Sequence, residues 1–288
     1  MKRYVITAIL CLFSMSVLYA TSEHNNKIRL IRSATLKIEY GDKTILLDPM
    51  LGEKGTLFSV LGTNINPRVH LTMPVNEILD EVDFVLLTHT HEDHYDRIAK
   101  DTIPKDTPFF VQPSDMDSVT VKDGFYKTTM IVDSINVDGI SITRIDGSHG
   151  RGKLAKMMGN SSGYIIKAED EPVIYIMGDC MWDDTTKTAV AKYNPDYIVV
   201  NSGGAIIPPQ SNTYGPVLPD EKEVMTMLRD TPSHIKLICV HMDALDHCQT
   251  TRSILRNEAI SNNVDVSRLI IPEDGEIVNL SYKNNQVD

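Results

Sequence analysis

The chain has 288 residues and a formal net charge of −11 at pH 7. This charge repels polyanions, so nucleic acid is disfavoured as a substrate unless a local basic patch intervenes. The length suits one large layered α/β domain. Beyond residue 20 the chain has three cysteines, Cys180, Cys239 and Cys248. An odd number outside the cytoplasm leaves at least one thiol unpaired, which argues against a disulfide scaffold.

Residues 1–20 differ in character from the rest of the chain. A basic start at Lys2 and Arg3 precedes a mostly apolar run that ends shortly before Ala20. This pattern predicts a secretory signal peptide that is cleaved after Ala20, with residues 21–288 forming a single exported domain. We therefore expect a periplasmic or secreted protein. An uncleaved anchor is the alternative, but the apolar run is shorter than the ~20 residues that a membrane span needs.

The first elements of this domain are predicted to be two strands joined by a tight turn. Residues 34–40 and 43–47 are rich in apolar side chains and flank Gly41 and Asp42, a strong hairpin signal. The second strand ends at Asp48. Residues 50–74 are rich in Gly, Pro and Asn and follow no sustained period, so we expect a loop that covers a site or forms a flap. Residues 75–82 are expected to form a short helix.

The next strand leads directly into a cluster of polar residues. The apolar run at residues 84–87 precedes a segment that contains His89, His91, Asp93 and His94. His89 and His91 alternate in extended geometry and can face one side of the strand end. Asp93 and His94 fall where the chain turns into a helix and can face a second position. This pattern favours two metal ions over a polar loop, in which three of nine histidines would have to cluster by chance.

Two further strands in the middle of the chain also end in polar residues. The strand at residues 140–145 leads to His149, and the strand at residues 173–177 leads to Asp179. The other elements expected here are strands at residues 109–111, 128–132 and 163–168 and a weak helix at residues 114–121.

The second half of the chain alternates helices and strands. We expect helices at residues 183–193, 221–228 and 249–261 and strands at residues 197–200 and 236–240. The last of these strands ends in His241. Hairpins early in each half and helices later predict two mixed sheets packed face to face with helices outside. The site is then expected along the edge where the strand ends meet.

The candidate site residues all lie at the ends of apolar strands: Asp48, His89, His91, Asp93, His94, His149, Asp179 and His241. The pattern His-x-His-x-Asp-His at residues 89–94 resembles the defining motif of the metallo-β-lactamase superfamily. The resemblance implies a four-layer αββα sandwich. It implies a first metal held by His89, His91 and His149, a second held by Asp93, His94 and His241, and Asp179 bridging both, with Asp48 in a supporting role.

Imidazole and carboxylate are the usual ligands of hydrolytic zinc, so we expect two Zn²⁺ ions, with Mn²⁺ as the second choice. Such pairs lie ~3.5–4 Å apart and can share a hydroxide, because metal coordination brings the pKa of water to about 7. We therefore expect a hydrolase that acts on an ester, lactone, amide or phosphodiester bond of a small-molecule substrate, with Asp93, Asp179 and His247 as its catalytic residues.

Within the superfamily, the form His-x-Asp-His-Tyr-Asp at residues 91–96, together with Gly178-Asp179 and the segment at His241, looks most like the branch that contains ascorbate-6-phosphate lactonase and the phospholipase-D-type hydrolases. True β-lactamases usually lack a bridging aspartate, so Asp179 counts against that activity, and oxygen-reducing diiron members have Glu where this chain has His91. Two alternatives stay open: a non-catalytic metal-binding protein on the same fold, or a true β-lactamase.

His241 is preferred to His247 as a ligand because it directly follows its strand, which leaves His247 to face the substrate or support the site. Arg151 and Lys153 either bind a carboxylate or phosphate of the substrate or belong to a solvated loop. The Ser202-Gly203-Gly204 segment suggests a close approach of backbone. The three cysteines are expected near the metal edge as buried small side chains that are not ligands.

Overall fold

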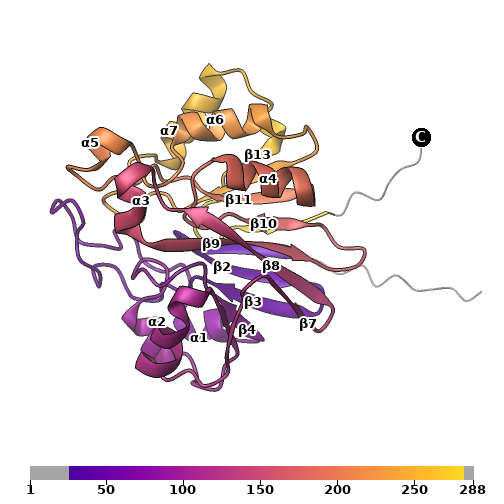
Figure 1. Cartoon of the computed structure of the whole chain (residues 1–288). Helices are drawn as coiled ribbons and strands as arrows, with labels where there is room; N and C mark the ends of the chain where they lie inside the picture. The colour runs from indigo at the N-terminus through magenta and orange to yellow at the C-terminus, as the bar shows by residue number, and fades with distance from the viewer. Residues whose placement is uncertain (1–25, 282–288) are drawn as a thin grey trace, which may run out of the picture.

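The computed structural model describes residues 26–281 and shows two mixed seven-stranded sheets packed face to face, with helices on both outer surfaces (Figure 1). The predicted αββα sandwich is confirmed. The predicted signal peptide at residues 1–20 lies outside the described residues. Between residues 26 and 281, no helix is both long and apolar enough to cross a membrane.

The first sheet has the order β14-β1-β2-β3-β4-β5-β6. The antiparallel pairs lie on the β14 side, and β3 to β6 run parallel. Its strands are β1 (Lys27–Arg32), β2 (Thr35–Tyr40), β3 (Lys43–Leu47), β4 (Phe84–Leu86), β5 (Phe109–Val111), β6 (Thr128–Met130) and β14 (Ile277–Asn279).

The second sheet has the order β13-β12-β11-β10-β9-β8-β7, with β10 to β13 parallel and the rest antiparallel. Its strands are β7 (Ser134–Val137), β8 (Ile140–Ser148), β9 (Asn160–Lys167), β10 (Ile174–Ile176), β11 (Tyr197–Asn201), β12 (Lys236–Val240) and β13 (Leu269–Ile270).

Helices cover both sheets. Figure 1 shows α1 and α2 below the first sheet and α4, α6 and α7 above the second. The helices are α1 (Val75–Leu79), α2 (Arg97–Thr102), α3 (Gly152–Met158), α4 (Asp184–Tyr193), α5 (Ser211–Tyr214), α6 (Glu221–Asp230) and α7 (Arg252–Ser261). Buried aliphatic side chains such as Ile38, Leu86, Ile166 and Val199 fill the space between the sheets. This core is expected of strands whose apolar side chains are covered on both faces.

Several elements differ from the sequence-based expectation. In place of a weak helix at residues 114–121, the structure has a 3₁₀ turn at Pro113–Asp115 and a π turn at Ser118–Lys122. The short helix α3 begins directly after Arg151, where a loop was expected. The sheet-edge strands β7, β13 and β14 were also not expected. These elements are short, and packing against neighbours that are distant in sequence stabilises them more than their own residue preferences do.

Candidate metal centre

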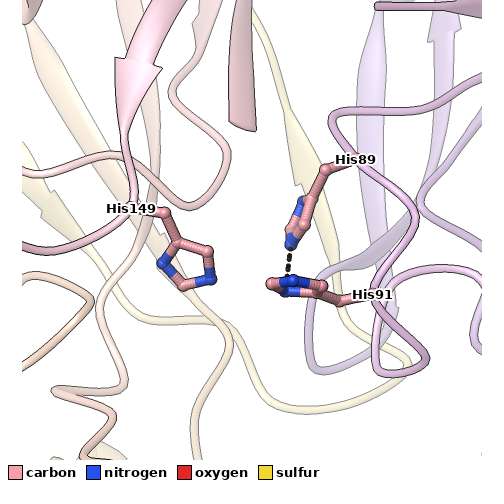
Figure 2. Close-up of side chains that lie close together, drawn as sticks. All are labelled: His89, His91 and His149. Atoms are coloured by element: carbon pink, nitrogen blue, oxygen red, sulfur yellow. Dashed lines mark hydrogen bonds between the residues drawn. The ribbon is translucent and has the colours of Figure 1, made fainter. Parts of the chain in front are cut away.

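Three histidines that follow strands of the two sheets come together. His89 and His91 follow β4, and the Nε2 atom of His89 lies 2.9 Å from the Nδ1 atom of His91. His149 follows β8 of the other sheet and points its ring at the same space (Figure 2). One ring nitrogen from each lies within 4.8 Å of the other two, a spacing that could hold a metal ion. These are the three residues predicted for the first metal.

A second cluster contains Asp93, His94 and His241, the residues predicted for the second metal. The Nε2 atoms of His94 and His241 lie 3.1 Å apart, and Asp93 Oδ2 lies 3.6 Å from His241 Nε2. His241 directly follows β12 and has a φ of 64°. Non-glycine residues adopt this left-handed conformation rarely, and strained backbone of this kind is enriched at functional sites.

Asp179 lies between the two clusters. Its Oδ2 atom is 3.2 Å from His94 Nε2 of the second cluster and 3.2 Å from His149 Nε2 of the first. Gly178 precedes it with a φ of 63°, and a Cβ atom there would lie 2.7 Å from a backbone oxygen. Glycine therefore permits the turn that brings this carboxylate to the centre.

Groups around the clusters hold the rings in place. Asp48 accepts from Nδ1 of His94 at 2.8 Å, and the backbone N–H and the hydroxyl of Thr88 also donate to it. His149 Nδ1 donates to the carbonyl of Val217 at 3.0 Å. Such partners orient the ring so that its other nitrogen would face a bound metal. The supporting role predicted for Asp48 agrees with these contacts.

Two orienting groups were missed by sequence reasoning. The Asn201 side chain donates to Asp179 Oδ1 at 2.7 Å and leaves Oδ2 directed at the histidines. Asn201 ends the apolar strand β11, so the strand-end rule that found the ligands could also have found it. The carbonyl of Val217 carries no comparable signal, because any residue type supplies this acceptor.

Cys180, Cys239 and Cys248 are buried, as expected, and all three are unpaired, where the odd count required only one to be. The Sγ atom of Cys248 lies 3.5 Å from His241 Nδ1, on the side of the ring away from the cluster. A Cβ atom added at Gly203 would lie 2.3 Å from the His241 carbonyl oxygen. The close backbone approach suggested for residues 202–204 is therefore confirmed.

The charges of the centre suit cations. Burial opposes the ionisation of Asp179, but the neighbouring His94 and His149 outweigh it and hold the pKa of this carboxyl well below its usual value. Asp93 behaves in the same way through His241 and His94. Burial, with the neighbouring imidazoles, lowers the pKa of His89 and of His149, which keeps these rings neutral as metal ligands must be. Burial acts in the same direction on His94 and His241, but neighbouring acidic groups, chiefly Asp179 for His94 and Cys248 for His241, outweigh it and raise the pKa of these two rings, so each must release a proton when a metal binds. Converging imidazoles and two ionised carboxylates fit two divalent ions.

A cavity of about 470 Å³ opens over this centre. Polar side chains, including His91, Asp93, Asp179 and His247, line part of it. Most of the wall is apolar and comprises Leu57, Phe58, Val60, Met158, Ala205, Ile207, Val217, Leu218 and Leu245. Three of these residues come from the 50–74 segment, which was expected to cover a site.

The structure brings His247 into the cavity, with Nε2 3.8 Å from Asp93 Oδ2. It does not bring Arg151 and Lys153 there. The Arg151 guanidinium pairs with Glu223 at 2.7 Å, and Lys153 is exposed on α3. Neither side chain lines the cavity.

Comparisons with known proteins agree with this geometry. The beta-lactamase superfamily domain matches residues 27–229. The UPF0173 protein YddR of Bacillus subtilis (strain 168) is 35% identical over 255 residues, which cover 86% of this chain and 98% of YddR.

Two crystal structures are also similar, each with 32% sequence identity. The structure of a possible metal-dependent hydrolase from Veillonella parvula has a TM-score of 0.84 and covers 89% of this chain and 100% of its own. An isothiocyanate hydrolase from Delia radicum gut bacteria has a TM-score of 0.81 and covers 89% of this chain and 99% of its own. The chain therefore belongs to the metallo-β-lactamase superfamily and, within it, to the UPF0173 family of metal-dependent hydrolases.

Proposed function

We propose that this chain is a dinuclear metal-dependent hydrolase that cleaves a small, uncharged substrate. The observation that carries the proposal is the place of Asp179, whose single Oδ2 atom lies 3.2 Å from a histidine nitrogen of each cluster. When bound, two such ions lower the pKa of a shared water to about 7 and polarise the bond to be cleaved.

The residues of the chain would hold and orient these ions. His89, His91 and His149 would bind the first, and Asp93, His94 and His241 would bind the second. Asp179 would touch both, and its negative charge, with that of Asp93, would offset part of the charge of two adjacent cations. The imidazole-rich donor set supports zinc as the metal, with manganese as the alternative.

The cavity supports a neutral substrate with an apolar body. Its wall is mostly aliphatic, and among the residues that the structure describes, no lysine or arginine lines it. Of the bond types considered, an ester, lactone or amide therefore fits better than a phosphodiester.

The likeness to the ascorbate-6-phosphate lactonase and phospholipase-D-type branch rests partly on Tyr95 and Asp96, which have structural contacts here. Tyr95 is buried against Phe109. Asp96 caps α2 by accepting from the backbone N–H of Ala99. These contacts support a role in folding and give no reason to prefer the phosphorylated substrates of that branch.

An isothiocyanate is a second candidate substrate class. One similar structure belongs to an isothiocyanate hydrolase that is 32% identical to this chain. An isothiocyanate is compact and uncharged and has an electrophilic central carbon, so it suits an apolar cavity above a metal centre. Addition of one water to that carbon would release an amine and carbonyl sulfide.

The test is turnover by the metal-loaded protein of a panel containing neutral esters, lactones, amides, β-lactams, isothiocyanates and bis-phosphodiesters. We expect turnover of at least one neutral class, loss of activity with a chelator and recovery with zinc. Two bound metal equivalents without turnover of any member would favour the non-catalytic alternative. Preferred turnover of a β-lactam would instead favour a true β-lactamase, and a reproducible metal content of zero would reject the site.

We also propose that the chain is exported after cleavage between Ala20 and Thr21. The basic start and apolar run of residues 1–20 support this proposal. Mass spectrometry of the protein recovered from its native host tests it, and a mature protein that retains Lys2 and Arg3 would contradict it.

A further inference from the structure

A closed loop, residues 57–66, forms one wall of the cavity. Leu57 and Asn66 exchange two backbone hydrogen bonds at its base, at 2.6 and 3.2 Å. Between these ends, Phe58 and Val60 line the cavity, while Phe58 is also 68% exposed at the surface. Apart from the bridge at its base, this wall lies outside the strands and helices of the fold. Something else must hold its shape.

The carboxylate of Asp246 lies inside this loop. It is buried, and five groups of the loop donate to it: the hydroxyls of Ser59 and Thr63, the backbone N–H groups of Val60 and Leu61, and the amide of Asn66. The two backbone donors lie at 3.2 and 3.1 Å and the Asn66 amide at 2.9 Å. In return, the backbone N–H of Asp246 donates to the Asn66 side chain at 2.9 Å. Hydrogen bonds to an ionised acceptor are stronger than those between neutral groups.

The residues before and after Asp246 in the sequence belong to the cavity. Its neighbours Leu245 and His247 both line the cavity, and the same segment begins at the predicted ligand His241. The carboxylate therefore connects loop 57–66 to the segment that carries the predicted ligand His241. The 50–74 segment has separate anchors outside this loop. Arg32 donates to the carbonyls of Met50, Gly52 and Val69, and Arg68 donates to the carbonyl of Asp243.

We propose that Asp246 is a positioning residue that holds loop 57–66 in the shape that recognises the apolar part of the substrate. This inference rests on the proposed function, since it assigns a selectivity device to that same site. Within residues 26–281, Asp246 touches none of the proposed metal ligands, and its one contact with a polar cavity residue outside the loop is to His247, whose Nδ1 atom lies 3.7 Å from Oδ1. Its loss therefore weakens the recognition of large substrates and leaves the metals and the chemical step in place.

The first test compares Asp246→Asn with the parent on a series of substrates of the turned-over class that differ only in the length of an apolar tail. The variant keeps the shape of the side chain but replaces an acceptor oxygen with an N–H group that faces donors. We expect KM for the longest tail to rise at least ~10-fold, with less than about a 3-fold change in kcat and an unchanged metal content. The ratio of kcat/KM between long and short tails should fall about 10-fold.

Two variants serve as controls. Asp101→Asn changes an exposed aspartate that pairs with Arg97 on the surface of α2, and it should leave every parameter unchanged. Ser59→Ala removes only one donor to Asp246, so it keeps the result interpretable if Asp246→Asn does not fold. It should also lower the ratio of kcat/KM between long and short tails, but by a smaller factor than Asp246→Asn does.

Hydrogen–deuterium exchange of the metal-loaded proteins gives a readout that does not depend on turnover. The amides of Val60 and Leu61 should exchange at least ~10-fold faster in Asp246→Asn than in the parent or in Asp101→Asn. Unchanged exchange would overturn the positioning role, and faster exchange with an unchanged tail-length ratio would overturn the selectivity role. A parent that turns over no substrate would defeat the proposed function instead, and exchange would still decide whether Asp246 holds the loop.

Discussion

The two oxygens of the Asp179 carboxylate have different partners. Oδ1 accepts from Asn201 at 2.7 Å, while Oδ2 faces histidines of both clusters. Because one oxygen is fixed by the fold, the other is held at the centre before any metal binds. Preorganisation of this kind limits the rearrangement that binding requires.

We expect Asp179→Asn to lower kcat at least ~100-fold, because it keeps the shape but removes the negative charge shared by both cations. Occupancy of the second site should fall as well. His247→Ala, as a comparison, should mainly change substrate preference. Kinetics and metal analysis on both variants check this. Near-parental kcat with two metals in Asp179→Asn, together with a lost metal in His247→Ala, would show that the ligands are assigned wrongly.

The contact between Cys248 and His241 leads to a second prediction. With its Nε2 atom on a metal, His241 carries its proton on Nδ1, which then donates to the Cys248 sulfur at 3.5 Å. Cys248→Ser preserves an acceptor and should keep two metal equivalents. Cys248→Ala removes the acceptor and should weaken binding of one metal about 10–100-fold, the scale of lost orienting contacts. Competition titrations against a metal buffer measure this, and equal affinities in the two variants would argue against an orienting role.

At the scale of elements, the strands that deliver the ligands were predictable because strands buried on both faces need near-continuous apolar runs. All seven predicted ligands were chosen because they follow the ends of these apolar runs. The structure brings them together. What sequence reasoning missed depends on contacts distant in sequence. The carbonyl of Val217 and the fold of loop 57–66 around Asp246 have no local signature, and the pairing of Arg151 with Glu223 joins residues 72 positions apart.

The backbone of Gly203 passes close to the backbone of His241, so a side chain at Gly203 should disturb the second metal cluster. A Cβ atom there would lie 2.3 Å from the His241 carbonyl oxygen and 2.8 Å from Cys248 Sγ. Gly203→Ala should therefore displace His241, lower the melting temperature and reduce occupancy of the second metal selectively. Gly163→Ala is a matched control, since its Cβ would meet backbone oxygens of Ile176 and Met177 instead. Thermal unfolding and metal analysis should show lost stability in both variants but selective loss of one metal only in Gly203→Ala.

In the molecule as a whole, the proposed ligands come from both sheets. His89, His91, Asp93 and His94 follow β4 of the first sheet, whereas His149, Asp179 and His241 follow strands of the second. Each cluster contains residues from both. Metal binding would therefore connect the two halves of the sandwich across their shared edge, in addition to the apolar core between them.

Metal removal should consequently lower the stability of the entire fold. A ligand that binds only the folded state at 100 times its Kd adds about 2.7 kcal/mol, and a domain of this size gains roughly 2–4 °C in Tm per kcal/mol. Chelation of the parent removes two such ions, so we expect it to lower Tm on the order of 10–20 °C and zinc to restore it. Because His247 lies outside both ligand clusters, His247→Ala should show the same shift. Calorimetry of chelated and zinc-restored proteins tests this, and an unchanged Tm despite the loss of two metal equivalents would mean that the metals do not connect the two sheets.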